Sequence, residues 1–145
     1  MFAIAGTIIG LCFVGPIANF NFLNTPFLLV SVLLGVFINS ILRIIISIIS
    51  FWIEDSTPFH WIYDKIILVL GTLFPIEMFP EILRPIIKCT PIFVVTYGPA
   101  RLIINFTFNQ FFKIIMAQIL YLVISITLLI ILYEKGVKKV NVNGG

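Results

Sequence analysis

Long apolar runs are the feature that most constrains how this chain can fold. Residues 27–51 and 111–133 are each predominantly apolar and long enough to cross a bilayer as a helix. In lipid the backbone polar groups must be satisfied internally, which restricts spanning segments to helices and closed barrels. The composition agrees, because 61% of the 145 residues are hydrophobic and 10% are charged, whereas roughly a quarter of residues are charged in soluble domains. The sequence therefore predicts an integral membrane protein.

Two further segments are candidates for membrane spans. Residues 1–18 are apolar and contain Gly6 and Gly10, whose G-x-x-x-G spacing would let another helix pack closely. Residues 58–75 are just long enough to cross the hydrocarbon core. We therefore predict an all-α, polytopic membrane helix bundle, a single transmembrane domain over 1–145. Its expected spans, about four in number, are residues 1–18, 27–51, 58–75 and 111–133.

Prolines interrupt the chain before the last span. Six of the eight prolines lie between residues 51 and 105. A proline removes a backbone donor and clashes with the preceding turn, so no straight helix can run from 73 to 101. We expect two short helical elements instead, 80–89 and 91–105, each with a proline near its first turn. Broken helices at membrane depth often mark a translocation route, so a re-entrant helical hairpin over 80–105 is predicted.

Basic residues suggest the orientation of the chain. Lys135, Lys138 and Lys139 follow the last span. The positive-inside tendency then makes residues 134–145 a cytoplasmic tail, with Gly136 expected to end the helix. Three lysines beside a span indicate topology rather than nucleic-acid binding. The prediction is a multi-pass protein of the cytoplasmic membrane, with its C-terminus and the loop after the second span inside the cell.

Arg43 is a basic residue within the second span, on the same face as Asn39. An arginine at that depth costs a few kcal/mol unless it snorkels, pairs or meets water. Two interpretations are open. Snorkelling toward the cytoplasmic end is the preferred one. The alternative is an ion pair with an acidic residue such as Asp64.

Sequence motifs for catalysis are missing. There is no G-x-x-x-x-G-K-[ST] phosphate-binding loop and no H-E-x-x-H zinc motif. His60 stands alone beside Trp61 and is interpreted as an interfacial aromatic residue. Cys12 and Cys89 lie in apolar surroundings and are interpreted as small buried hydrophobic residues. We therefore expect no catalytic, cofactor-binding or metal-binding residues and no enzyme activity in this chain.

Several short patterns occur together from residue 51 to the end, which is about two thirds of the chain. They are Phe51-Trp52 before an acidic loop, Gly71, Pro75 followed by Phe79-Pro80-Glu81, Pro91, the corner Tyr97-Gly98-Pro99, and a basic tail that closes on Gly144-Gly145. This string resembles the C-terminal part of bacterial ABC-type exporter permeases of the type-2 class. More narrowly, it resembles a branch whose members pair with an ATPase and often with a second permease.

The resemblance implies a six-span subunit with two re-entrant helices between its fifth and sixth spans. The present chain corresponds to the last four spans and is expected to be truncated at its N-terminus. The resemblance further implies an ABC ATPase partner that binds ATP and Mg²⁺, a second permease subunit in a homo- or heterodimer, and a lipid bilayer around them. No nucleic acid is expected as a partner.

The resemblance also implies alternating access, with residues 80–105 as the external gate for outward export of a hydrophobic or amphipathic substrate. Gln118, in the last span, has two open roles: it lines the pathway, or it forms a hydrogen bond to a neighbouring helix. The alternative function is a non-transporting membrane scaffold, an assembly subunit or a permease fragment. The residues expected near the pathway or gate are Glu77, Glu81, Tyr97, Arg101, Asn105, Asn109 and Gln118. Glu54 and Asp55 are expected to face the ATPase, and Gly6 and Gly10 to pack helices.

Overall fold

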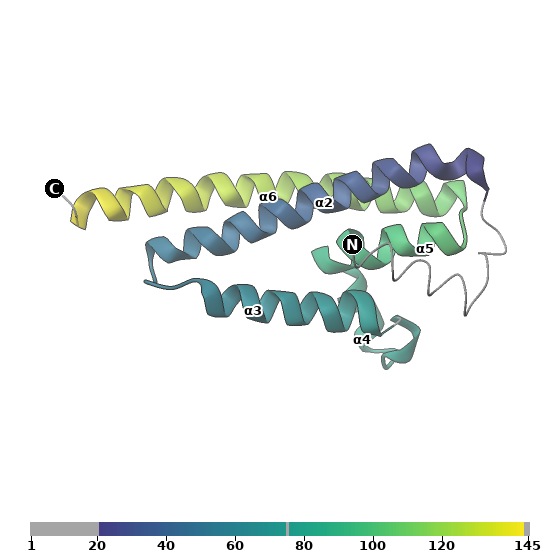
Figure 1. Cartoon of the computed structure of the whole chain (residues 1–145), viewed down its shortest axis with the longest axis horizontal. Helices are drawn as coiled ribbons and strands as arrows, with labels where there is room; N and C mark the ends of the chain where they lie inside the picture. The colour runs from purple at the N-terminus through teal and green to yellow at the C-terminus, as the bar shows by residue number, and fades with distance from the viewer. Residues whose placement is uncertain (1–20, 75, 144–145) are drawn as a thin grey trace, which may run out of the picture.

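The computed structural model describes residues 21–74 and 76–143, and over these residues the chain forms an elongated bundle of helices without strands (Figure 1). In chain order the elements are η1 (Phe22–Asn24), α2 (Thr25–Ile48), η2 (Ile49–Phe51), α3 (Thr57–Ile66), η3 (Ile67–Leu73), η4 (Ile76–Met78), α4 (Leu83–Lys88), η5 (Phe93–Tyr97), α5 (Gly98–Ile104) and α6 (Phe108–Asn143). The segments η3 and η5 are π-helical. The predicted all-α helix bundle is confirmed.

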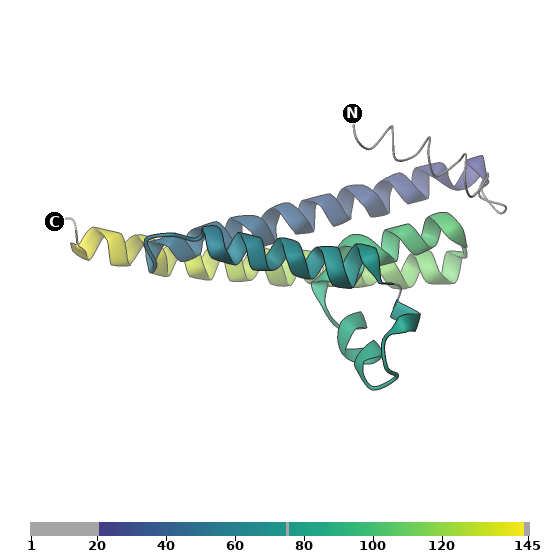
Figure 2. The ribbon, with the colours of Figure 1, turned by 60° about the horizontal axis from the view of Figure 1, so that its bottom comes forward.

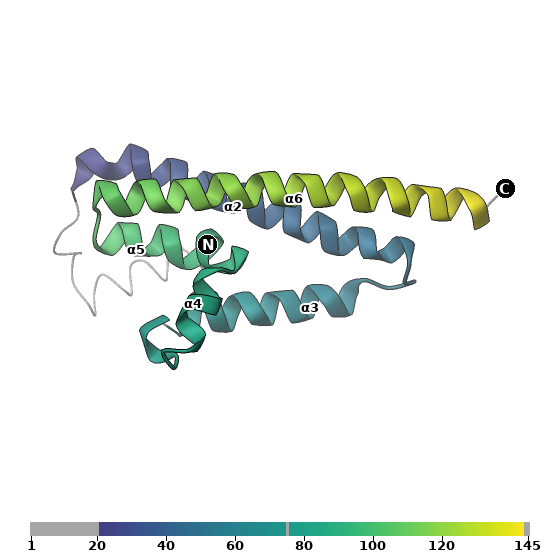
Figure 3. The same cartoon turned by 180° about the vertical axis from the view of Figure 1, so that it is seen from behind.

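The long helices α2 and α6 lie side by side and run in the same direction, while α3 returns in the opposite direction (Figures 1 and 3). The loop between η2 and α3 therefore lies at the same end of the bundle as the C-terminus. Within the described residues, two helical stretches, Phe22–Phe51 and Phe108–Lys139, have the length and hydropathy needed to cross a bilayer. Both leave many large apolar side chains exposed, as a surface that faces lipid would.

The helix formed by α3 and η3 is shorter, with ten and seven residues. Its assignment as a span over 58–75 stays a prediction, as does the topology. The expected span 1–18 and the pair Gly6 and Gly10 lie outside the described residues.

Two short helical elements follow, as the prolines predict. The first is α4, which projects from the side of the bundle (Figure 2). The second consists of η5 and α5, and it lies along the long helices. Leu102 of α5 is fully buried in an apolar cluster with Leu28 of α2 and Phe111 of α6. The second element is therefore part of the core, whereas the first is peripheral.

A polar contact joins α2, η5 and α6 in the core. Gln118 of α6 is fully buried, and its Nε2 donates to the backbone carbonyls of Ser31 at 2.8 Å and Val94 at 2.9 Å. The hydroxyl of Ser31 donates to Gln118 Oε1 at 3.3 Å. Of the two roles open to Gln118, the bond to neighbouring helices is confirmed.

Pro99 explains why the carbonyl of Val94 needs this partner. The N–H of Gly98 donates to the carbonyl of Phe93, five residues earlier. The next donor in that pattern would be Pro99, opposite the carbonyl of Val94, but proline has no N–H. The Gln118 amide supplies the missing donor, so a side chain of the last helix repairs the proline break.

Two glycines let η5 approach its neighbours closely. A Cβ atom on Gly35 of α2 would lie 2.9 Å from the carbonyl oxygen of Val95. A Cβ atom on Gly71 of η3 would lie 2.4 Å from the hydroxyl oxygen of Thr96. Real side chains do not tolerate such distances, so η5 fits between α2 and η3 only because both positions lack a side chain.

The expected end of the last helix at Gly136 is wrong, since α6 continues to Asn143. The glycine has a packing role instead. A Cβ atom there would lie 2.1 Å from the ring of Phe51, so the ring occupies the space that a side chain would take. A glycine in a helix weakens it but does not by itself terminate it.

A line of polar contacts joins α2 to α3. Arg43 Nη2 lies 2.6 Å from Asp64 Oδ1, and its guanidinium lies over the ring of Tyr63. The Tyr63 hydroxyl donates to Asn39 Oδ1 at 2.9 Å. The ion pair with Asp64 is therefore confirmed, while snorkelling of Arg43 stays a prediction. One face of α2 thus meets one face of α3 through polar side chains.

Two isolated side chains are also placed by the structure. His60 Nε2 lies 3.1 Å from the hydroxyl of Ser47 and so extends the polar contacts between α3 and α2. Cys89 is a free, exposed thiol, so its interpretation as a buried residue is wrong. The Tyr121 hydroxyl of α6 donates to the Cys89 carbonyl and holds the end of α4 against the bundle. Cys12 lies outside the described residues.

We predict that Gln118→Leu destabilises the protein by about 1–3 kcal/mol, because the buried carbonyl of Val94 loses its donor. Thermal unfolding in detergent, followed by tryptophan fluorescence, measures the change. Thr127→Val is the matched control, since Thr127 is exposed on the same helix and bonds only within it. Equal unfolding temperatures for the two variants would contradict the bridging role of Gln118.

A second prediction concerns the glycine contacts. Gly71→Ala should destabilise the protein by about 1–3 kcal/mol through overpacking, and the double variant Gly71→Ala/Thr96→Ala should recover part of the loss. Gly35→Ala should be equally damaging but insensitive to Val95→Ala, because the obstructing atom there is a backbone oxygen. Thr72→Ala, at an exposed neighbouring position, is the control. If the second alanine substitution restored stability to both glycine variants, or to neither, the close contacts at Gly71 and Gly35 would not be what holds η5.

Candidate functional site

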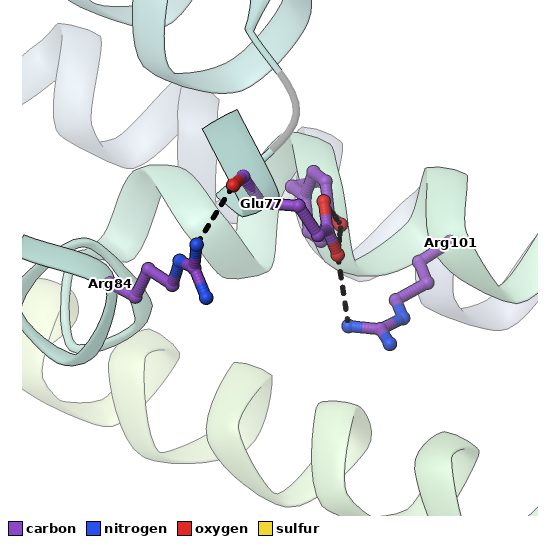
Figure 4. Close-up of polar contacts among 4 residues, drawn as sticks. Glu77, Arg84 and Arg101 are labelled. Carbon is purple, nitrogen blue, oxygen red and sulfur yellow. Dashed lines mark hydrogen bonds and ion pairs between the residues drawn. The ribbon is translucent and has the colours of Figure 1, made fainter. Parts of the chain in front are cut away.

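The polar residues of the predicted gate converge on Glu77, which lies in η4. Its two carboxylate oxygens accept the hydroxyl of Tyr97 at 2.8 and 2.9 Å. Nη1 of Arg101, on α5, lies 3.9 Å from Glu77 Oε1 (Figure 4). The structure thus brings together three of the residues that the sequence predicted near the gate. We call Glu77, Tyr97 and Arg101 the Glu77 cluster.

Arg84 supports this cluster from the other side. Its Nη2 donates to the backbone carbonyl of Glu77 at 3.0 Å (Figure 4). Its Nε donates to the backbone carbonyl of Phe79 at 2.9 Å. The turn around η4 is therefore fixed by the guanidinium of α4. No sequence motif pointed to this role of Arg84. Its i, i+3 spacing to Glu81 was the one local signal, and that ion pair is long, at 4.0 Å.

The cluster is charged at neutral pH. The hydrogen bond from Tyr97 lowers the pKa of Glu77 below its usual value, and the charges of Arg101 and Arg84 act in the same direction. A single carboxylate with a phenol and a guanidinium offers no acid–base pair for catalysis. The arrangement instead connects η4 to η5 and α5.

The other predicted gate residues are not part of this cluster. Glu81 is 91% exposed. Asn105 ends α5, where its N–H donates to the Arg101 carbonyl at 3.0 Å, and Asn109 is exposed at the start of α6. Gln118 is buried in the core, and its full burial assigns it to helix packing in this conformation.

The two acids predicted to face an ATPase lie together in the exposed loop before α3. Asp55 Oδ1 accepts the N–H of Thr57 at 2.8 Å, at the start of the helix. Hydrogen bonds from the side chain and the backbone of Thr57 lower the pKa of Asp55. Glu54 precedes it. The loop between η2 and α3, which carries both acids, lies at the end of the bundle where the C-terminus is found (Figure 1).

Metal ligands do not gather in the part of the chain that the structure describes, where no three His, Cys, Asp or Glu side chains come close enough to hold an ion. The geometry is that of a helical membrane protein with a polar contact beside the two short helical elements.

Comparison with known proteins identifies the family. The model of a family described as "ABC-2 family transporter protein" matches residues 2–144, almost the whole chain. No curated protein and no solved structure matches. The match agrees with the two long apolar helices and with the resemblance to type-2 permeases. This chain therefore belongs to the ABC-2 family of transporter proteins, as a permease component of an ABC transporter.

Proposed function

We propose that this chain is the membrane-spanning permease subunit of an ATP-driven exporter that moves a hydrophobic or amphipathic substrate outward. The family match over residues 2–144 carries the proposal, because it supports a transport permease. The exposed large apolar side chains are mostly isoleucine, leucine, valine and phenylalanine. Such side chains suit contact with a hydrophobic or amphipathic substrate as well as with lipid, which supports the proposed substrate class.

A separate ABC ATPase supplies the energy, because the sequence has no loop for binding ATP phosphates. The exposed loop with Glu54 and Asp55 is the proposed contact for this ATPase. A second permease subunit, identical or different, completes the pathway. In this arrangement the C-terminus and the loop are cytoplasmic, and the re-entrant elements are on the outer side.

The Glu77 cluster is the proposed external gate. Its members come from η4, η5 and α5, so closing it joins the peripheral part of the re-entrant segment to the part in the core. The ion pair is partly exposed and long, and such pairs contribute about 0–1 kcal/mol. The cost of opening such a gate is therefore set mainly by the Tyr97 hydrogen bonds to Glu77.

The rest of the bundle is suited to move as one body. The Gln118 contact joins α2, η5 and α6, and the polar contacts of Arg43 join α2 to α3. Alternating access requires such stiff units, with bending confined to a few connections.

We predict that the chain, coexpressed with an ABC ATPase from the same genome, copurifies with it in detergent and that the complex hydrolyses ATP faster than the ATPase alone. The variant Glu54→Lys/Asp55→Lys should reduce the complex severalfold, because it reverses the charge of the proposed contact. Glu134→Lys, a charge reversal outside that loop, is the control. A folded, inserted chain that forms no complex would favour the alternative of a scaffold or a non-transporting fragment.

The proposed topology can be tested with the natural thiol at the end of α4. In a Cys12→Ser background, a membrane-impermeant maleimide should label Cys89 in intact cells, because this residue is exposed and lies on the proposed outer side. In a Cys12→Ser/Cys89→Ser background, Glu54→Cys should be labelled only after the cells are opened. The reverse pattern would invert the topology and remove the gate from the outer side.

A further inference from the structure

A basic pocket lies between the re-entrant segment and the start of α6. Its volume is about 340 Å³. Cationic side chains from three different helices line it, together with apolar side chains of η5 and α6. The cationic residues are Lys88 of α4, Arg101 of α5 and Lys113 of α6, and the apolar ones include Phe93, Ile114 and Ala117.

The three cations are poorly neutralised. Arg101 has Glu77 at 3.9 Å. Within the described residues, neither Lys88 nor Lys113 has a carboxylate within 4.0 Å. With Glu77 counted, the pocket carries a net charge of about +2, from three cations and one carboxylate. Like charges that converge from separate helices repel one another, so the arrangement is favourable when an anion occupies the pocket.

Membrane topology does not explain these cations. The lysines that follow the last apolar run lie at the end of α6 beside the C-terminus, whereas Lys113 lies near its start, at the opposite end of the bundle (Figure 3). The positive-inside tendency enriches lysine and arginine at one side only. A basic group at the other end calls for a different cause, such as a ligand.

The remaining wall of the pocket limits the kind of anion. Phe93 and Ile114 provide an apolar surface next to the charges. Together these features fit a molecule with an anionic head and an apolar chain.

We propose that this pocket binds the anionic head group of an amphiphile, with a phosphate on Lys88, Arg101 and Lys113 and the chain against Phe93 and Ile114. This inference rests on the proposed function, because it assigns an acidic head group to the amphiphile that the exporter moves. Binding itself requires no ATPase, so it can be tested separately. The same head-group chemistry occurs in acidic membrane lipids and in free phosphate, and the experiment distinguishes the two sources.

The test measures thermal stabilisation of the purified chain in neutral detergent by three probes. These are dioctanoyl phosphatidylglycerol, dioctanoyl phosphatidylcholine and inorganic phosphate, each titrated over the same concentrations. A ligand that binds only the folded state raises the unfolding temperature. We expect phosphatidylglycerol to raise it by several degrees and the other two probes to have little effect.

The variants Lys88→Gln and Lys113→Gln should each weaken the apparent affinity for phosphatidylglycerol about fivefold, in line with the usual contribution of one basic residue to binding acidic lipid. Lys135→Gln and Lys138→Gln remove exposed cations at the other end of α6 and should leave the affinity unchanged. These four variants leave the Glu77 cluster intact.

Three outcomes would overturn the proposal. Equal stabilisation by phosphatidylcholine would mean that the head-group charge is not recognised. Full stabilisation by inorganic phosphate would replace the amphiphile with a small anion. If Lys135→Gln and Lys138→Gln weakened the affinity for phosphatidylglycerol as much as Lys88→Gln and Lys113→Gln do, the lipid would be attracted nonspecifically by positive charge. If phosphatidylglycerol binds as expected but no ATPase complex forms, the proposed function fails while the pocket stands.

Discussion

The bond from Gln118 to the Val94 carbonyl is the interaction on which the rest of the structure depends. Pro99 leaves that carbonyl without a helical donor, and in a membrane no water is available to replace it. The Gln118 amide satisfies it from α6 and also bonds to Ser31 of α2. One side chain thereby compensates for a broken helix and fixes that helix between the two longest ones. The hydrogen bond that compensates for the proline break therefore also connects η5 to α2 and α6.

This core contact divides the segment from η4 to α5 into two parts with different stability. The segment η5 is held by Gln118 and by the close approaches at Gly35 and Gly71. The peripheral part, with η4 and α4, is held mainly by Arg84, by the Glu77 cluster and by the Tyr121 bond to Cys89. Regions with few buried contacts open first. If the Glu77 cluster acts as the proposed gate, its movement is expected to begin with η4 and α4 while η5 stays in place.

The sequence predicted the features that depend on local chemistry. Apolar runs indicated the long helices, and prolines indicated two short elements close to where α4 and α5 lie. It did not predict contacts that depend on which helix faces which. Arg43 meets Asp64 only because α3 runs antiparallel to α2, and Gly136 accepts the Phe51 ring only because α6 continues past it. Lys88, Arg101 and Lys113 are far apart in the chain, so nothing local indicated their common pocket.

Arg101 belongs both to the Glu77 cluster and to the basic pocket, and this double role connects the two proposals. An anion in the pocket competes with Glu77 for the guanidinium. At 3.9 Å and partly exposed, the pair with Glu77 contributes about 0–1 kcal/mol, so an anion held also by Lys88 and Lys113 has the advantage. The Tyr97 hydrogen bonds then remain as the main hold on Glu77. Occupation of the pocket would thus weaken the gate contact from the side where the exported molecule lies, which couples the presence of cargo to the ease of opening.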